Sequence, residues 1–121
     1  MKKLVNLTPH PINVYLYGTD PLVIPPSGQV ARVAQDYTVL GDLDLGDGRI
    51  PLVAPLYGAI QGLPDPQDDT FYIVSALVAQ AAWAQGRKDV LAPDTGAGAV
   101  RDSDGRVIGV RRLLAHPDLK L

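Results

Sequence analysis

The stretch 71–91, FYIVSALVAQAAWAQGRKDVL, decides the fold of this 121-residue chain. Its first four residues are aromatic or β-branched, which favours a buried strand. Ser75 follows and can cap a helix by accepting a hydrogen bond from an amide of the first turn. The segment from Ala76 to Gln85 contains helix formers and neither Pro nor Gly, and Gly86 is a typical stop. The sequence therefore predicts a strand, a helix and a second strand that starts at Asp89.

The predicted helix is apolar on almost every side, since only Gln80 and Gln85 interrupt its Ala, Leu, Val and Trp residues. A short helix of this composition is normally buried. We therefore expect it in the core, with Trp83 as its one bulky anchor. The alternative is that one face of the helix contacts a second subunit.

The composition indicates short strands joined by many tight turns. All thirteen acidic residues are Asp, which favours turns and caps, and the chain contains 12 Gly and 11 Pro. Hydrophobic residues make up 46% and charged residues 20%, which argues against disorder. The expected fold is a single α+β domain over residues 1–121, with a compact, mostly antiparallel sheet, one buried helix, and frayed ends at 1–3 and 115–121.

The same composition excludes several classes of function. The chain has no Cys, so disulfides, thiolate metal sites and a cysteine nucleophile are ruled out. It has only two His, so neither a multi-histidine metal site nor a cofactor is expected. A net charge of −2 argues against general nucleic-acid binding. No apolar run approaches the ~20 residues that span a bilayer, and the expected location is the cytoplasm, without membrane contact.

The remaining elements are predicted from alternation and from turn residues. Prolines at 51 and 55 indicate a broken segment or an edge strand. In chain order we expect a strand at 12–17, a turn at 18–21, a hairpin that pairs 22–24 with 29–39, a loop at 41–49, the broken or edge segment at 50–60, and a hairpin at 99–114 that turns at 102–105.

Three groups of polar residues are candidates for a ligand site. Near the N-terminus, Asn6, Thr8 and His10 lie in a Pro-rich segment, where Asn6 and Thr8 alternatively satisfy local backbone groups. Ser75 and the amides behind it can hold an anion, although capping alone explains the residue. His10 can also act as a base or a metal ligand.

The third group follows the strand that is predicted to start at Asp89. Asp94, Thr95 and Gly96 match the letters of the aspartic-protease tripeptide, but that chemistry needs two such carboxylates, and the flanking sequence differs from that family. A ligand-facing loop or an ordinary turn is more typical. In the ligand hypothesis, Asp94 and Thr95 hydrogen-bond hydroxyl groups and Arg101 pairs with charge.

Several segments together resemble a group of small uncharacterised proteins of bacteriophages and bacteria. They are LVNLTPHPINV, IPPSGQVARV, FYIVSALVAQA, DVLAPDTG and AVRDSDGRVIGVRRL, and they cover most of the chain from Leu4 to about Leu114. The resemblance implies a phage or prophage-like accessory context and carries over no catalytic residue.

The leading hypothesis is a non-enzymatic binding protein that holds a small anionic ligand, for example one derived from a nucleotide, or a host protein. One alternative is a structural protein that self-associates into a homo-oligomer through its apolar helix and strand edges. Another is a small hydrolase that uses His10 with Ser75 or Asp94.

Overall fold

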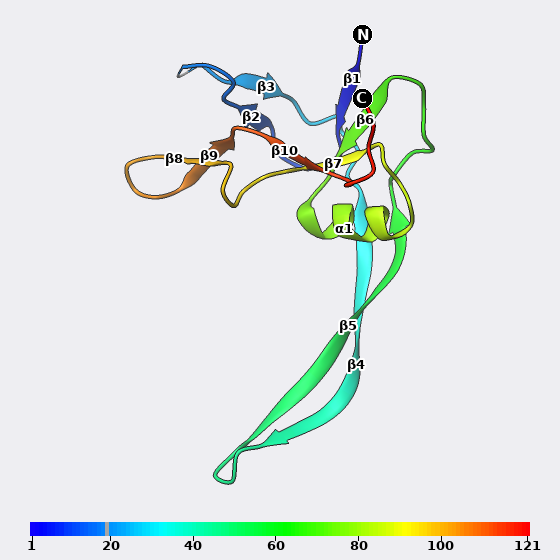
Figure 1. Ribbon diagram of the computed structural model, residues 1–121, viewed down its shortest axis with the longest axis vertical. Helices are drawn as coiled ribbons and strands as arrows, with labels where there is room; N and C mark the ends of the chain where they lie inside the picture. Colours follow the sequence, from blue (N-terminus) through cyan, green and yellow to red (C-terminus); the bar gives the residue numbers. More distant parts are fainter. Residues whose placement is uncertain (19) are drawn as a thin grey trace.

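The computed structural model describes residues 1–18 and 20–121. Thr19, within the turn expected at 18–21, lies outside the described residues. The described residues form one helix and ten strands, and the strands are arranged in three sheets (Figure 1). Two of the sheets and the helix make up the body of the molecule, and the third sheet projects from it.

Sheet A is the centre of the body and has the strand order β1-β6-β7-β10. Its first three strands are parallel, and β10 is antiparallel to β7. The helix α1 (Ala76–Ala84) connects the parallel neighbours β6 and β7, as the stretch 71–91 predicts. The strands are β1 (Lys3–Asn6), β6 (Thr70–Ile73), β7 (Val90–Pro93) and β10 (Leu113–Ala115).

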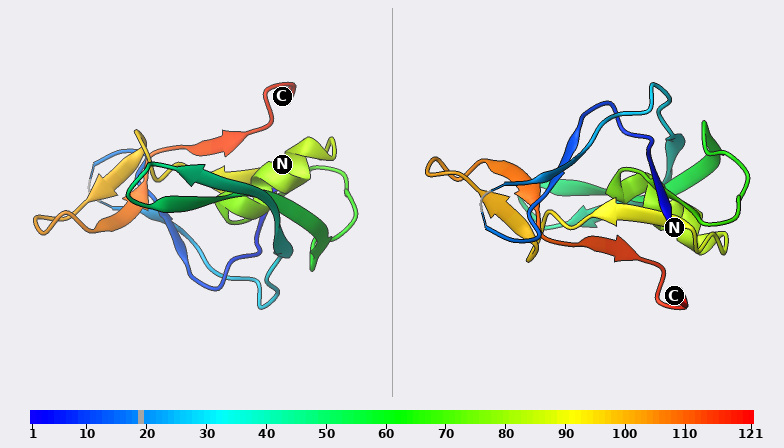
Figure 2. Two further views of the ribbon diagram at one scale, coloured as in Figure 1. Left: turned by 90° about the horizontal axis from the view of Figure 1, so that it is seen from below. Right: turned by 90° about the horizontal axis from the view of Figure 1, so that it is seen from above.

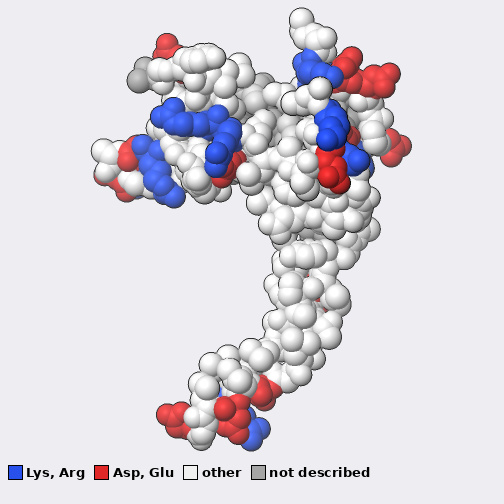
Figure 3. All heavy atoms as spheres, viewed as in Figure 1, with Lys and Arg blue, Asp and Glu red and all other residues white. Residues whose placement is uncertain are grey.

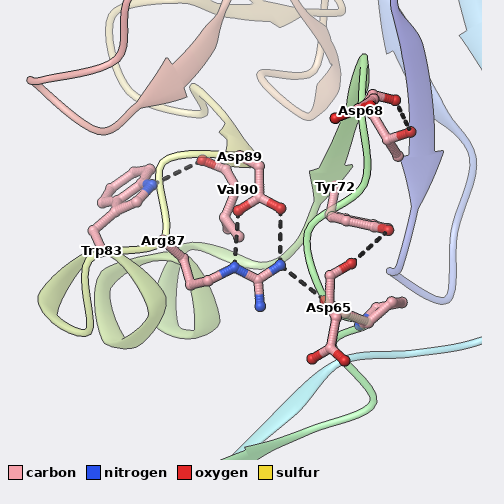
Figure 4. Close-up of polar contacts among 9 residues, drawn as sticks. Asp65, Asp68, Tyr72, Trp83, Arg87, Asp89 and Val90 are labelled. Carbon is pink, nitrogen blue, oxygen red and sulfur yellow. Dashed lines mark hydrogen bonds and ion pairs between the residues drawn. The ribbon is translucent and has the colours of Figure 1, made fainter.

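Local contacts explain where α1 begins and ends. The hydroxyl of Ser75 accepts a hydrogen bond from the amide of Val78, which caps the first turn. Gly86 follows the last turn with a φ of 87°, which a residue with a side chain rarely adopts. The indole nitrogen of Trp83 donates to the carbonyl oxygen of Val90 at 2.8 Å and so ties α1 to β7 (Figure 4).

The chain between α1 and β7 is held by one arginine. Arg87 donates from Nε and Nη2 to the two carboxylate oxygens of Asp89, and Nη2 also donates to the carbonyl oxygen of Pro64 at 2.8 Å (Figure 4). The hydroxyl of Tyr72 donates to the neighbouring carbonyl oxygen of Asp65. These bonds fasten the loop before β6 to the loop after α1.

Sheet B lies on one side of the body and has the order β3-β2-β9-β8 (Figure 2). The pairs β2–β3 and β8–β9 are antiparallel, and β2 lies parallel to β9. The predicted turn at 102–105 does connect β8 to β9. The strands are β2 (Ile12–Val14), β3 (Leu22–Ile24), β8 (Ala99–Arg101) and β9 (Val107–Val110).

The core has two parts, one on each face of sheet A. Side chains alternate between the faces of a strand, so Tyr72 and Val74 belong to the part beneath α1, whereas Ile73 belongs to the part beneath sheet B. The expectation of a buried helix is confirmed for its inner side, where Val78, Ala79, Ala81 and Ala82 are buried. Its outer side, with Gln80, faces solvent.

The third sheet is a long hairpin of β4 (Arg32–Asp44) and β5 (Arg49–Gln61), called the arm below. It starts beside α1 and extends away from the body (Figure 1). Within the described residues, β4 and β5 pair only with each other. Residues 42–49 are called the tip of the arm.

The structure agrees with a mixture of strands and one helix but differs from the expected single antiparallel sheet. Parallel pairing prevails in sheet A: the crossover through α1 makes β7 parallel to β6, and β1 lies parallel to β6 on its other side. The shape is also less compact than expected, because the arm projects from the body (Figure 1). At the ends, Lys3 already belongs to β1, and Leu119 packs against the core beneath sheet B.

Two predictions about the strands are wrong, and a third is confirmed in one of its two alternatives. Residues 22–24 pair with β2 and not with 29–39, because β4 finds its partner in β5. The loop expected at 41–49 is mostly strand, and only residues 45–48 form the turn. For 50–60, where a broken segment or an edge strand was expected, the structure has an unbroken edge strand, because its prolines occupy positions at which no amide is needed.

Candidate functional site

Asn6 is a buried structural residue and not an open ligand contact. It is 1% exposed. Its amide group donates to the carbonyl oxygens of His10 at 2.8 Å and Ile24 at 3.0 Å. Its oxygen accepts from the amide and the hydroxyl of Thr8, at 2.9 and 2.7 Å. Asn6 therefore uses its hydrogen bonds to hold the turn 6–10, which is the local alternative considered from the sequence.

Two of the predicted residues do meet at one pocket. Thr8 and Ser75 line a cavity of about 230 Å³ where the arm joins the body. The other lining is mostly apolar, and Arg32 contributes the one charged side chain. The complete lining is Leu7, Thr8, Pro9, Val30, Ala31, Arg32, Val33, Ser75, Leu77 and Val78.

Asp94 is buried and paired with a residue that the sequence analysis did not single out as its partner. Asp94 is 5% exposed. Its Oδ2 accepts from Nε of Arg112 at 2.6 Å, and its Oδ1 accepts from the amide of Gly96 at 3.0 Å. A side chain on Gly98 would collide with both Asp94 and Arg112, since a Cβ there would lie 2.9 Å from each. The loop 94–98 thus packs against both members of this ion pair, of which Asp94 is buried and Arg112 is exposed.

Of the other predicted residues, Arg101 and His10 lie apart from these two places. Arg101 donates to the carbonyl oxygen of Gly105 at 2.7 Å and so closes the β8–β9 turn. His10 is exposed, and no hydrogen bond in the described part of the chain joins its ring to Ser75 or Asp94. Thr95 lies in the loop beside Asp94. The set predicted for one ligand is therefore divided among the turn, the pocket, the loop and the hairpin.

The Asp94–Arg112 pair predicts a specific pH dependence of stability. The hydrogen bond from Arg112 holds the pKa of the Asp94 carboxyl below its ordinary value, against the opposing effect of burial, and the Gly96 amide acts in the same direction. The stabilisation is therefore complete above the pKa of an unfolded aspartate, about 4, and is lost as pH falls through the lower folded pKa. Asp94→Asn is expected to lower the urea midpoint at pH 7 and to reduce its change between pH 7 and pH 3.

The control for this variant is Asp104→Asn. Asp104 is exposed in the β8–β9 turn, and its side chain forms no ion pair in the described part of the chain. It should keep the pH dependence of the parent chain. An Asp94→Asn variant with the parent's pH dependence would contradict the role assigned to the pair.

The arm is the second candidate site, and it is a surface for interaction. Ten large apolar side chains on it are exposed, among them Val39 at 75% and Leu40 at 67%. They lie on both faces of the ribbon, because neighbouring residues of a strand point to opposite faces. The ten are Tyr37, Val39, Leu40, Leu43, Leu45, Ile50, Leu52, Val53, Leu56 and Tyr57.

Charge is absent from the middle of the arm and gathers at its tip (Figure 3). No charged residue lies at 37–41 or 50–61, whereas the tip carries Asp42, Asp44, Asp47 and Arg49. The sequence signal for this surface is the apolar run after residue 49, whose prolines indicate a broken segment or an edge strand.

No group of three or more potential metal-ligating side chains gathers among the residues described. The one described helix, α1, is too short to cross a membrane. Comparison of the chain with protein-family models, with curated proteins and with solved structures found no match.

Proposed function

We infer that this chain is a non-enzymatic assembly protein whose arm joins it to a further copy of itself. The observation that carries this inference is the arm: a two-stranded ribbon that is apolar on both faces and projects from the body. A two-stranded hairpin is at best marginally stable in water by itself. A further strand beside such a hairpin gives its free edge hydrogen-bond partners and its apolar side chains cross-strand neighbours.

The size of this apolar surface suits a stable interface. The ten exposed residues together present on the order of 1,000 Å² of surface, divided between the two faces of the ribbon, and a specific interface buries about 800 Å² per partner. Exposed apolar patches larger than a few hundred Å² are rare on monomers. A second copy offers the same surface and brings the required apolar partner.

The geometry favours this function over the two alternatives. A site for a small anion would retain only Thr8 and Ser75 of the predicted set, in a pocket that is mostly apolar. A hydrolase would need His10 near Ser75 or Asp94, yet the Ser75 hydroxyl accepts from Val78 and the Asp94 carboxylate binds Arg112. The phage-like context suggested by the resemblance stays a prediction.

The test is to place charges on the most exposed part of the arm. The double variant Val39→Lys with Leu40→Lys is expected to weaken self-association about 10,000-fold, because four side chains, two from each copy, each lose about 1.5 kcal/mol of apolar burial in the assembly. Light scattering coupled to size-exclusion chromatography measures the mass over a range of concentrations.

The matched control is Leu22→Lys with Val23→Lys. These two side chains are 51% and 52% exposed on β3, in the body and away from the arm. The control should associate like the parent chain. If the arm variant keeps the parent's mass at every concentration, the proposed function is wrong.

A further inference from the structure

The two edges of the arm differ in their hydrogen-bonding groups. In an antiparallel pair, residues alternate between positions whose N–H points to the partner strand and positions whose N–H points outward. Proline has no N–H and so belongs at outward positions. Pro55 lies opposite Tyr37, which sets residues 35, 37 and 39 of β4 as outward positions. Ala31 lies an even number of residues before Gln35, so its N–H is expected to point outward as well. It does so, because it donates to the carbonyl oxygen of Leu7 at 3.0 Å.

The same alternation makes 51, 53, 55 and 57 the outward positions of β5. Two of them, Pro51 and Pro55, lack the N–H that a further strand would need. β4 contains no proline and keeps an N–H at Gln35, Tyr37 and Val39. The edge of β5 is therefore blocked against a further strand, whereas the edge of β4 is complete.

From this difference, and resting on the proposed function, we propose that β4 pairs edge to edge with β4 of a second copy, antiparallel across a twofold axis near Tyr37. The result is a four-stranded sheet in which both β4 strands are central and both β5 strands are outer. Outward residues 35, 37 and 39 of each copy provide about six hydrogen bonds across the axis. In the single chain the Tyr37 amide donates to the exposed carboxylate of Asp36 at 2.8 Å. In the dimer it would donate instead to the backbone carbonyl oxygen of Tyr37 in the second copy.

Charge selects the antiparallel direction. A parallel arrangement would place the two tips together, with Asp42, Asp44 and Asp47 of one copy facing those of the other, and like charges side by side are unfavourable. In the antiparallel arrangement each tip lies near the base of the other arm. The exposed charge at that base includes Arg32, so the acidic tip lies close to a positive charge.

The body limits the register of this pairing. At Ala31 the edge of β4 is already occupied by Leu7 of the same chain, so pairing with a second copy begins beyond that residue. At the other end the ladder shifts between Val39 and Gly41, where Leu40 forms a bulge. The regular part of the edge is therefore 35–39, and its centre is Tyr37.

A pair of proline substitutions tests the choice of edge. Val39 and Val53 lie opposite each other in the ribbon, and both have outward N–H groups. Val39→Pro is expected to weaken the dimer at least tenfold, because two of the shared hydrogen bonds are lost, one at each symmetric position. Val53→Pro is expected to leave the dimer unchanged, because the β5 edge is already blocked. An equal effect of both substitutions, or a larger effect of Val53→Pro, overturns the proposal.

Cysteine cross-linking tests the axis without relying on a destabilising variant, and the chain contains no other Cys. Tyr37→Cys is expected to form a disulfide-linked dimer rapidly, since directly opposite residues have Cα atoms about 5.5 Å apart, which a disulfide accepts. Val53→Cys on the outer strand and Asp47→Cys at the tip are expected to stay unlinked under the same oxidant.

The cross-linking outcomes separate this proposal from the proposed function. A dimer that links through Asp47→Cys indicates contact between the tips, and one that links through Val53→Cys indicates pairing of β5. A dimer that links through none of the three indicates another surface. Each result overturns the β4 pairing while self-association stands, whereas a parent chain that remains monomeric overturns both.

Discussion

A chain in which residues 35–57 are replaced by an Asn-Gly turn is expected to be a folded monomer. The flanking residues already lie side by side, because a Cβ on Gly58 would be 3.1 Å from the Cβ of Ala34. Asn-Gly is the preferred two-residue connection between antiparallel strands. Neither part of the core contains a residue from 35–57, although Val33 and Ile60 at the base pack against it.

Circular dichroism and light scattering measure this outcome. We expect a thermal midpoint within about 5 °C of the parent chain in its monomeric form, which corresponds to less than about 1 kcal/mol for a domain of this size. The mass should be that of one chain at every concentration. A shortened chain that still dimerises would place the association on the body, and one that fails to fold would make the arm part of the fold.

Asn6→Ala is expected to destabilise the body by about 3 kcal/mol. The substitution leaves the carbonyl oxygen of Ile24 and the amide of Thr8 without their buried partner, and an unsatisfied buried group costs about 1–3 kcal/mol. A loss of this size lowers the thermal midpoint by more than about 10 °C. Urea unfolding at pH 7 measures the free energy directly.

Thr8→Val is the control for the hydroxyl alone. It removes the bonds from the Thr8 hydroxyl to Asn6 and His10 but keeps the backbone bond to Asn6, so we expect a loss of about 1 kcal/mol. If Asn6→Ala costs no more than Thr8→Val, the buried amide does not organise the turn as described.

Local signals predicted the part of the fold that local interactions determine. The stretch 71–91 has a capping Ser75, a run of helix formers and a stopping Gly86 within a few residues of one another, and the structure has β6, α1 and β7 there. The parallel direction of these strands and the order of sheet A depend on residues far apart in the chain. No periodicity in the sequence reports them.

The arm was missed because its residues give mixed local signals. Gly41 and the aspartates around it are typical of loops, and Pro51 and Pro55 are typical of a break or of an edge strand. Pairing along the whole hairpin overrides these preferences, since both prolines occupy outward positions and the turn needs only residues 45–48.

The candidate site shows the same division. The local hydrogen bonds of Asn6, Thr8 and Ser75 are of the kind that these residue types form with nearby backbone, and that role is one of the alternatives that the residue types predict. The partner of Asp94 is Arg112, 18 residues away. The predicted hairpin at 99–114 contains several arginines. Only the fold determines which of them pairs with Asp94.

Native mass spectrometry of the complete chain at micromolar concentration tests the central claim most directly. It reports the number of chains and any retained ligand in one experiment. We predict a ligand-free dimer of two 12.9-kDa chains that dissociates to monomers when the arm is replaced by the short turn. A parent chain that stays monomeric with its arm intact would contradict the claim that the arm joins copies of this protein.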